Sequence, residues 1–227
     1  MKRLLKRAAG TLGLRVSYTL LTFVTSVVLA RLLGPTGFGT YTYCISWTYL
    51  LAIPATLGFD GLLGREVAIY QTKFAWNHMS GLLRWANTLA FFSSLAIATI
   101  GIASTTWGSN QQDPQVILCF WLVMIALPMI ALRNIRRGSM RGLHEIVWGL
   151  CPEMLVAPVL LLSLIGASAV WLKTSFTVTW AVGAYTLVTG ITLLLSALLL
   201  DRTLPFNVQT ALPRYYRLNW LKQAWPF

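Results

Sequence analysis

Six long apolar stretches follow one another along the chain, separated by shorter polar segments. A helix needs about 20 predominantly apolar residues to cross the hydrocarbon core of a bilayer. None of the stretches alternates between apolar and polar positions as a half-buried strand does. The pattern therefore predicts an all-α polytopic membrane protein with six transmembrane helices, at approximately 11–33, 41–63, 85–107, 116–133, 146–168 and 177–200.

The connections indicate how these helices are arranged. Segments 34–40 and 108–115 are short, which predicts antiparallel neighbours and a bundle of three helical hairpins, whereas 64–84 and 201–224 are longer and more polar. No long linker divides the chain, so we expect a single transmembrane domain over 1–227. Within the third span, small side chains recur every four residues, a spacing that favours close helix packing in membranes. These small residues are Ala86, Ala90, Ser94 and Ala98.

The composition agrees with a membrane protein and excludes most soluble ones. Hydrophobic residues make up 56% of the chain and charged residues only 11%, against about 25% charged residues in soluble domains. The net charge of +12 does not indicate nucleic-acid binding, because so apolar a chain cannot present the solvated basic face that phosphate backbones require. We therefore expect the lipid bilayer as a partner, and no nucleic acid.

The distribution of lysine and arginine predicts the orientation, since cytoplasmic segments of membrane proteins are enriched in both. All of these residues except Arg31 and Lys173 fall in four segments that share one side when six helices cross. Both termini are therefore expected in the cytoplasm. The alternative is a cleaved signal peptide, with MKRLLKR as its basic region and cleavage after Ala30, but removing it would leave an odd number of spans.

Features of an enzyme are scarce in the sequence. His78 and His144 fall between spans, and no paired carboxylates accompany them. The glycines of G-P-T-G-F-G at 34–39 follow no strand, so a nucleotide-binding loop is not indicated. The three cysteines lie in apolar runs without the spacing of a disulfide framework or a metal site. They are Cys44, Cys119 and Cys151. We expect no catalytic residues, no metal and no cofactor.

Ionisable residues within the predicted spans are candidates for function, because a charge in hydrocarbon is costly and usually faces a partner or a water-filled cavity. Glu153 lies deepest among the acidic residues. The other candidates lie near helix ends, where long side chains can reach the interface, so a structural role and a functional role both stay open for them. These are Arg15, Arg31, Asp60 and Arg65, and Glu145 at the start of the fifth span is a further candidate.

Two stretches carry a resemblance to a known family. They are LARLLGPTGFGTYTY at 29–43 and ATLGFDGLLGREVA at 55–68. Together they resemble the N-terminal signature of bacterial polysaccharide flippases, which belong to the multidrug/oligosaccharidyl-lipid/polysaccharide exporter superfamily. The similarity covers residues 11–68, and beyond it only hydropathy and loop charge agree.

The resemblance implies a function that hydropathy alone does not indicate. Such proteins translocate undecaprenyl-pyrophosphate-linked oligosaccharide units across the bacterial cytoplasmic membrane, by alternating access, for O-antigen, capsule or exopolysaccharide biosynthesis. Two six-helix lobes surround their central cavity, so this chain corresponds to an N-terminal lobe. Its tail, RLNWLKQAWPF at 217–227, resembles the linker to a seventh span. A second lobe, a second copy or other polysaccharide-assembly proteins are then expected partners, and the isolated chain is expected not to flip substrate.

Chemistry and resemblance together suggest candidate binding residues. Arginine suits a pyrophosphate, because its planar fork donates two hydrogen bonds at once. Arg15, Arg31 and Arg65 are therefore candidate pyrophosphate contacts, and only Arg31 and Arg65 lie within the matching stretches. Asp60 and Glu153 are candidate ion-pair or ion-coupling residues, since a buried carboxylate can titrate.

Other functions stay open from the sequence. A drug/cation antiporter of the same superfamily would favour acidic residues, whereas arginine is in excess here. A peptidoglycan-precursor flippase would share the architecture. A membrane-embedded polysaccharide-assembly enzyme would usually carry a sizeable loop with clustered catalytic residues, which the sequence lacks. We therefore expect a transporter rather than an enzyme.

Overall fold

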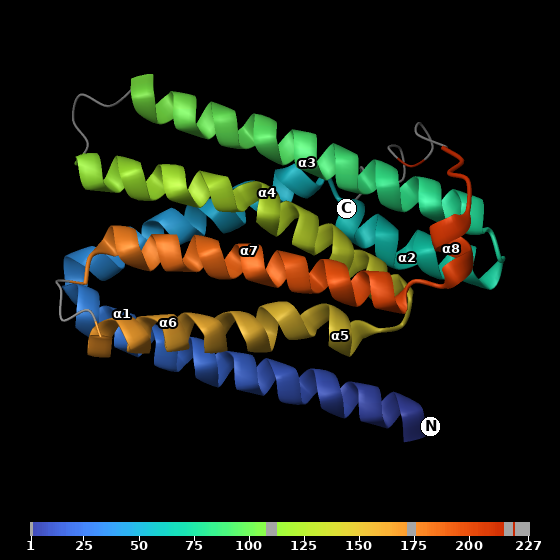
Figure 1. Cartoon of the computed structure of the whole chain (residues 1–227), viewed down its shortest axis with the longest axis horizontal. Helices are drawn as coiled ribbons and strands as arrows, with labels where there is room; N and C mark the ends of the chain where they lie inside the picture. Colours follow the sequence, from blue (N-terminus) through green and yellow to red (C-terminus); the bar gives the residue numbers. More distant parts are fainter. Residues whose placement is uncertain (1, 108–112, 172–175, 216–219, 221–227) are drawn as a thin grey trace.

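The computed structural model describes residues 2–107, 113–171, 176–215 and 220, and these residues form helices and short connections without any strand. The helices lie side by side as an elongated bundle (Figure 1). They are α1 (Lys2–Thr56), α2 (Phe59–Thr72), α3 (Trp76–Trp107), α4 (Pro114–Gly142), α5 (Ile146–Cys151), the π-helical turn η2 (Pro152–Val156), α6 (Ala157–Trp171), α7 (Val178–Thr203) and α8 (Phe206–Thr210). The all-α architecture predicted from the sequence is confirmed.

Five helical segments, rather than the six expected, are long and apolar enough to cross a membrane in the described part of the chain. The difference arises in α1, because the expected spans 11–33 and 41–63 are joined in one helix. The segment Gly10–Thr56 has 47 residues, far more than one crossing needs. In Figure 1, α1 runs along the bundle, turns and runs back as two arms.

The turn in α1 is made by one residue. Gly34 has φ 70° and ψ 177°, and glycine adopts a positive φ without the steric cost of a side chain. Pro35 follows directly, and proline suits the first turn of a helix, where its missing N–H is not needed. The segment expected as a turn at 34–40 is therefore helical again immediately after Gly34.

Polar segments expected to be loops are largely helical as well. The second arm of α1 ends at Thr56, where Leu57 and Gly58 take positive φ values of 49° and 74°. The segment 64–84, expected as a loop, is mostly helical, because α2 continues to Thr72 and α3 begins at Trp76 rather than near 85. Helix α4 continues to Gly142, so the arginines expected in a loop after 133 lie on a helix. The C-terminal motif at 217–227, apart from Trp220, and Lys173 lie outside the described residues.

Helix α4 is the centre of the bundle and packs against α1, α2, α3 and α7. The row of small residues on α3 is buried, with Ala86, Ala90, Ser94 and Ala98 all at most 4% exposed. The packing role predicted for this row is confirmed. Large apolar side chains such as Phe23, Phe92, Leu194 and Leu198 are instead exposed, as expected for a surface that contacts lipid.

The connections between helices lie at two opposite ends of the bundle. The start of α1, the α2–α3 and α4–α5 connections and α8 lie at one end of the bundle, and the turn of α1 lies at the other (Figure 1). Trp220 returns to the first end, where it is buried and its Nε1 donates a hydrogen bond to the Tyr70 hydroxyl at 3.0 Å. The segments rich in lysine and arginine thus gather at one end.

Helices α2 and α4 are in close contact at Gly138. A Cβ atom at this position would lie 2.6 Å from the backbone oxygen of Asp60. We predict that Gly138→Ala lowers stability by about 1–3 kcal/mol, because the extra methyl group forces the two helices apart. Thermal unfolding in detergent measures the change. Gly166→Ala is the matched control, since nothing lies within 4 Å of that position, and an equal loss in both variants would contradict the prediction.

Candidate functional site

The three arginines proposed from the sequence as pyrophosphate contacts lie apart from one another. Arg15 and Arg31 are exposed on the first arm of α1. Arg65 is on α2, where its side chain is 49% exposed and pairs with Glu66 at 3.3 Å. The structure does not bring these three side chains together, and their role as phosphate contacts stays a prediction.

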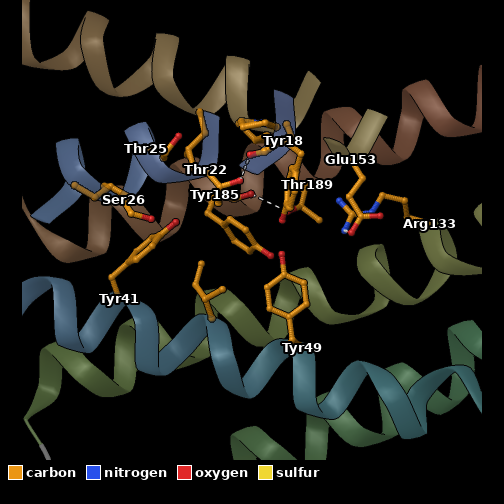
Figure 2. A pocket seen from close by; sticks show the side chains of 16 residues that line it. Tyr18, Thr22, Thr25, Ser26, Tyr41, Tyr49, Arg133, Glu153, Tyr185 and Thr189 are labelled. Atoms are coloured by element: carbon orange, nitrogen blue, oxygen red, sulfur yellow. Dashed lines mark hydrogen bonds and ion pairs between the residues drawn. The ribbon is translucent and has the colours of Figure 1, made fainter. Parts of the chain in front are cut away.

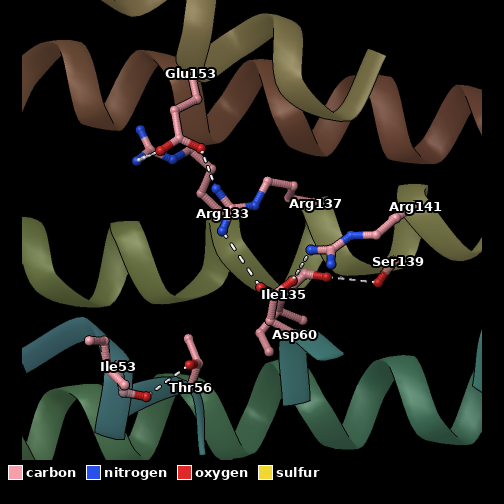
Figure 3. A network of polar contacts seen from close by, with 9 residues as sticks. All are labelled: Ile53, Thr56, Asp60, Arg133, Ile135, Arg137, Ser139, Arg141 and Glu153. Carbon is pink, nitrogen blue, oxygen red and sulfur yellow. Dashed lines mark hydrogen bonds and ion pairs between the residues drawn. The ribbon is translucent and has the colours of Figure 1, made fainter. Parts of the chain in front are cut away.

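The two proposed acidic residues, by contrast, join one network with arginines of α4 (Figure 3). Glu153 pairs with Arg133 at 3.4 Å and with Arg137 at 2.8 Å. Asp60 pairs with Arg137 at 3.6 Å and with Arg141 at 2.9 Å. Arg137 therefore bridges the two carboxylates. We call Asp60, Arg133, Arg137, Arg141 and Glu153 the charge network.

Local structure explains why these side chains converge. Arg133, Arg137 and Arg141 recur every four residues, which places them on one face of α4. Asp60 is in the first turn of α2, just after the left-handed Leu57–Gly58 break. Glu153 lies in the π-helical turn that begins at Pro152, and such turns inside helices are frequent at functional sites.

The charge network contains one more positive than negative charge and is partly shielded from solvent. The Arg133 side chain is 6% exposed and that of Glu153 is 19% exposed. Arg133 also donates to the Thr192 hydroxyl at 3.4 Å. The Nε atoms of Arg133 and Arg137 are buried without a hydrogen-bond partner among the described residues. The surplus positive charge gives the network capacity for an anion.

Two cavities meet at the charge network and share Tyr49 and Glu153 in their walls. The larger has a volume of about 550 Å³ and is lined by Asp60, Asn134 and Arg137 among others. The smaller, of about 200 Å³, lies between the two arms of α1, α6 and α7, with Arg133 at one end (Figure 2). Charged and hydroxyl-bearing side chains thus line hollows inside a bundle whose outer surface is apolar.

The arginines of α4 were missed as site residues in the sequence analysis, where they counted only as charges on one side of the membrane. Their four-residue spacing was a visible signal for a shared helix face. The described residues contain no group of three or more His, Cys, Asp or Glu side chains that could hold a metal ion. What the arrangement offers chemically is charge-assisted hydrogen bonding to an anion, with carboxylates close enough to compete for the same donors.

Comparisons with known proteins identify the family. No curated protein and no solved structure matches the chain significantly. A family model described as polysaccharide biosynthesis protein matches residues 4–227, which includes both stretches that suggested the resemblance and extends it over the whole membrane domain. The chain therefore belongs to the polysaccharide biosynthesis protein family, with a role in polysaccharide biosynthesis or export.

Proposed function

We propose that the protein translocates a lipid-linked oligosaccharide pyrophosphate across the bacterial cytoplasmic membrane. The observation that carries this proposal is the charge network, which faces cavities inside a membrane-embedded helical bundle. A lipid-linked saccharide has an anionic, hydroxyl-rich headgroup that must cross hydrocarbon. Family membership supplies the link to polysaccharides.

Coulomb attraction explains why the charge network suits a pyrophosphate. Opposite charges attract far more strongly in a low-dielectric interior than in water. Arg137 lines the larger cavity, and its guanidinium can donate to phosphate oxygens. A bound pyrophosphate would take over donors that Glu153 and Asp60 occupy. The arginines would then pair with phosphate oxygens in place of carboxylates, so no arginine is left unpaired in the membrane interior.

The proposed activity moves the substrate without changing its covalent structure, so the protein is not an enzyme in this proposal. The gathering of basic segments at one end of the bundle supports cytoplasmic termini. Alternating access needs two bodies that rock against each other. The described bundle would supply one of them, and a second lobe or a second copy would supply the other.

A reconstituted system tests the proposal. The protein, together with the second lobe or second copy that alternating access requires, is placed in liposomes whose outer leaflet carries a short-chain polyprenyl pyrophosphate linked to a labelled sugar. We expect part of the label to become protected from a membrane-impermeant pyrophosphatase, and protein-free liposomes to show no protection. Mass spectrometry of the lipid before the pyrophosphatase is added separates this result from enzymatic activity of the protein. Conversion of the lipid to a longer or cleaved product, without protection, would favour a polysaccharide-assembly enzyme instead.

A further inference from the structure

The smaller cavity has a lining that the charge network does not explain. Four tyrosines and four aliphatic hydroxyl residues surround it (Figure 2). We call it the tyrosine cavity, lined by Tyr18, Tyr41, Tyr49, Tyr185, Thr22, Thr25, Ser26 and Thr189. These residues come from both arms of α1 and from α7. A helical bundle in lipid has no need of so many hydroxyl groups in one place for packing alone.

The hydroxyl groups retain hydrogen-bonding capacity toward the cavity. Those of Thr22, Thr25 and Thr189 donate to the carbonyl four residues earlier in their helices, so their oxygens can still accept. Tyr41 is 8% exposed, and neither its hydroxyl nor that of Ser26 has a hydrogen-bond partner among the residues that the structure describes. In Figure 2, Tyr41 extends from the second arm of α1 toward Ser26. The cavity thus presents unpaired donors beside available acceptors.

Apolar surface alternates with these hydroxyls. Leu29, Ile45, Leu161 and Val188 also line the cavity, and the tyrosine rings add aromatic faces. Aromatic faces carry negative electrostatic potential and attract the weakly positive C–H groups of a ligand. A ligand with C–H faces and a rim of hydroxyls matches this alternation, and a pyranose ring has that construction.

Other ligand classes fit the lining less well. A hydrocarbon chain in the cavity would cover the hydroxyls of Tyr41 and Ser26 without offering them a hydrogen bond, which is unfavourable. A second phosphate would meet one cation only, because Arg133 and Glu153 are the charged residues in the wall and are already paired at 3.4 Å. A neutral polyhydroxylated ligand avoids both costs. The volume of about 200 Å³ corresponds to about seven water molecules, which suits one sugar ring rather than a whole oligosaccharide.

We propose that the tyrosine cavity binds a single neutral sugar ring of the substrate headgroup, with Tyr41 and Ser26 as direct hydrogen-bonding contacts. This inference rests on the proposed translocation and adds a saccharide subsite beside the anion site. Tyr49 and Glu153 belong to the walls of both cavities. A headgroup can therefore place its phosphates at Arg137 and a sugar ring among the tyrosines at the same time.

Free sugars provide a direct test that does not depend on transport. Saturation-transfer NMR on the purified protein in detergent uses a panel of methyl pyranosides as probes. We expect the wild type to bind at least one of them and Tyr41→Phe, which keeps the ring and loses the hydroxyl, to weaken that binding about two- to tenfold. Ser26→Leu should abolish it by filling the cavity. Tyr43→Phe is the matched control, because Tyr43 is on the same arm and 51% exposed.

Transport of two lipids separates the subsite from the anion site. One is a polyprenyl pyrophosphate that carries a sugar, and the other is the same lipid without the sugar. Tyr41→Phe should raise the half-saturating concentration for the sugar-bearing lipid alone. Equal effects on both lipids, equal effects of Tyr43→Phe, or no pyranoside binding by the wild type would overturn the inference. Pyranoside binding that Tyr41→Phe weakens, without transport of either lipid, would leave the subsite standing and reject the proposed function.

Discussion

Substitution of Glu153 by leucine is expected to lower the free energy of unfolding by about 3–5 kcal/mol, because it leaves a buried arginine without its counter-charge. Glu153 is the one carboxylate that pairs with Arg133 among the described residues, and the Arg133 side chain is only 6% exposed. Without Glu153, the remaining side-chain partner of Arg133 is the Thr192 hydroxyl at 3.4 Å. An unpaired arginine in a membrane interior is costly and functionally disruptive. Thermal unfolding in detergent and the protein level in the membrane measure the loss.

Removal of both Arg133 and Glu153 separates the effect of their ion pair on stability from its effect on transport. Arg133→Leu combined with Glu153→Leu should recover most of the lost stability, because a well-packed apolar pair can replace a buried ion pair. Polysaccharide export should nevertheless be lost in this double variant, since the charge network has lost two of its members. Glu145→Gln is the control, because the Glu145 side chain makes no capping hydrogen bond to α5 and has no ion pair among the described residues. A double variant no more stable than Glu153→Leu would contradict a stabilising role for the pair.

The hydropathy of the sequence was sufficient to predict an all-α membrane bundle but not the junctions between helices. Gly34 and Pro35 were expected within a turn of several residues, yet one glycine with a positive φ reverses the chain. Sequence patterns report how apolar a segment is. They do not report whether a polar segment continues as a helix, as α4 does through Arg141, because the partners that stabilise its charges are distant in sequence.

Only part of the candidate site could be predicted from the sequence. Asp60 and Glu153 stood out because an acidic residue in an apolar span is rare and costly. Their partners did not stand out, because the positive-inside rule already accounts for arginines near helix ends. Pairing of Asp60 with Arg137 depends on the packing of α2 against α4, which no local pattern encodes. The tyrosine cavity likewise combines residues of α1 and α7 whose convergence requires the tertiary fold.

Replacement of Arg137 by glutamine is expected to reduce translocation of the lipid-linked saccharide about 10- to 100-fold, since charge-assisted hydrogen bonds contribute about 1.5–3 kcal/mol. Arg137 is the member of the charge network that contacts both carboxylates, at 2.8 Å and 3.6 Å, and it lines the larger cavity. Its side chain is 25% exposed, so glutamine can be accommodated without burying an unpaired charge. Arg137→Lys should recover part of the rate, because lysine keeps the charge but loses the planar fork. The liposome protection assay measures the rates.

Matched arginine variants decide whether the phosphate is bound by the charge network or by the arginines suggested by the sequence. Arg136 is the neighbour on α4, and its Nη1 donates to the Leu193 carbonyl at 2.8 Å. Arg136 thus contacts α7 and is not a member of the charge network, so Arg136→Gln should leave the transport rate within about twofold of the wild type. Arg15, Arg31 and Arg65 are replaced by glutamine in parallel. Because their side chains lie apart, each of these variants is measured by itself. Normal transport by Arg137→Gln together with lost transport by Arg31→Gln or Arg65→Gln would move the anion site to the stretches that carry the family resemblance.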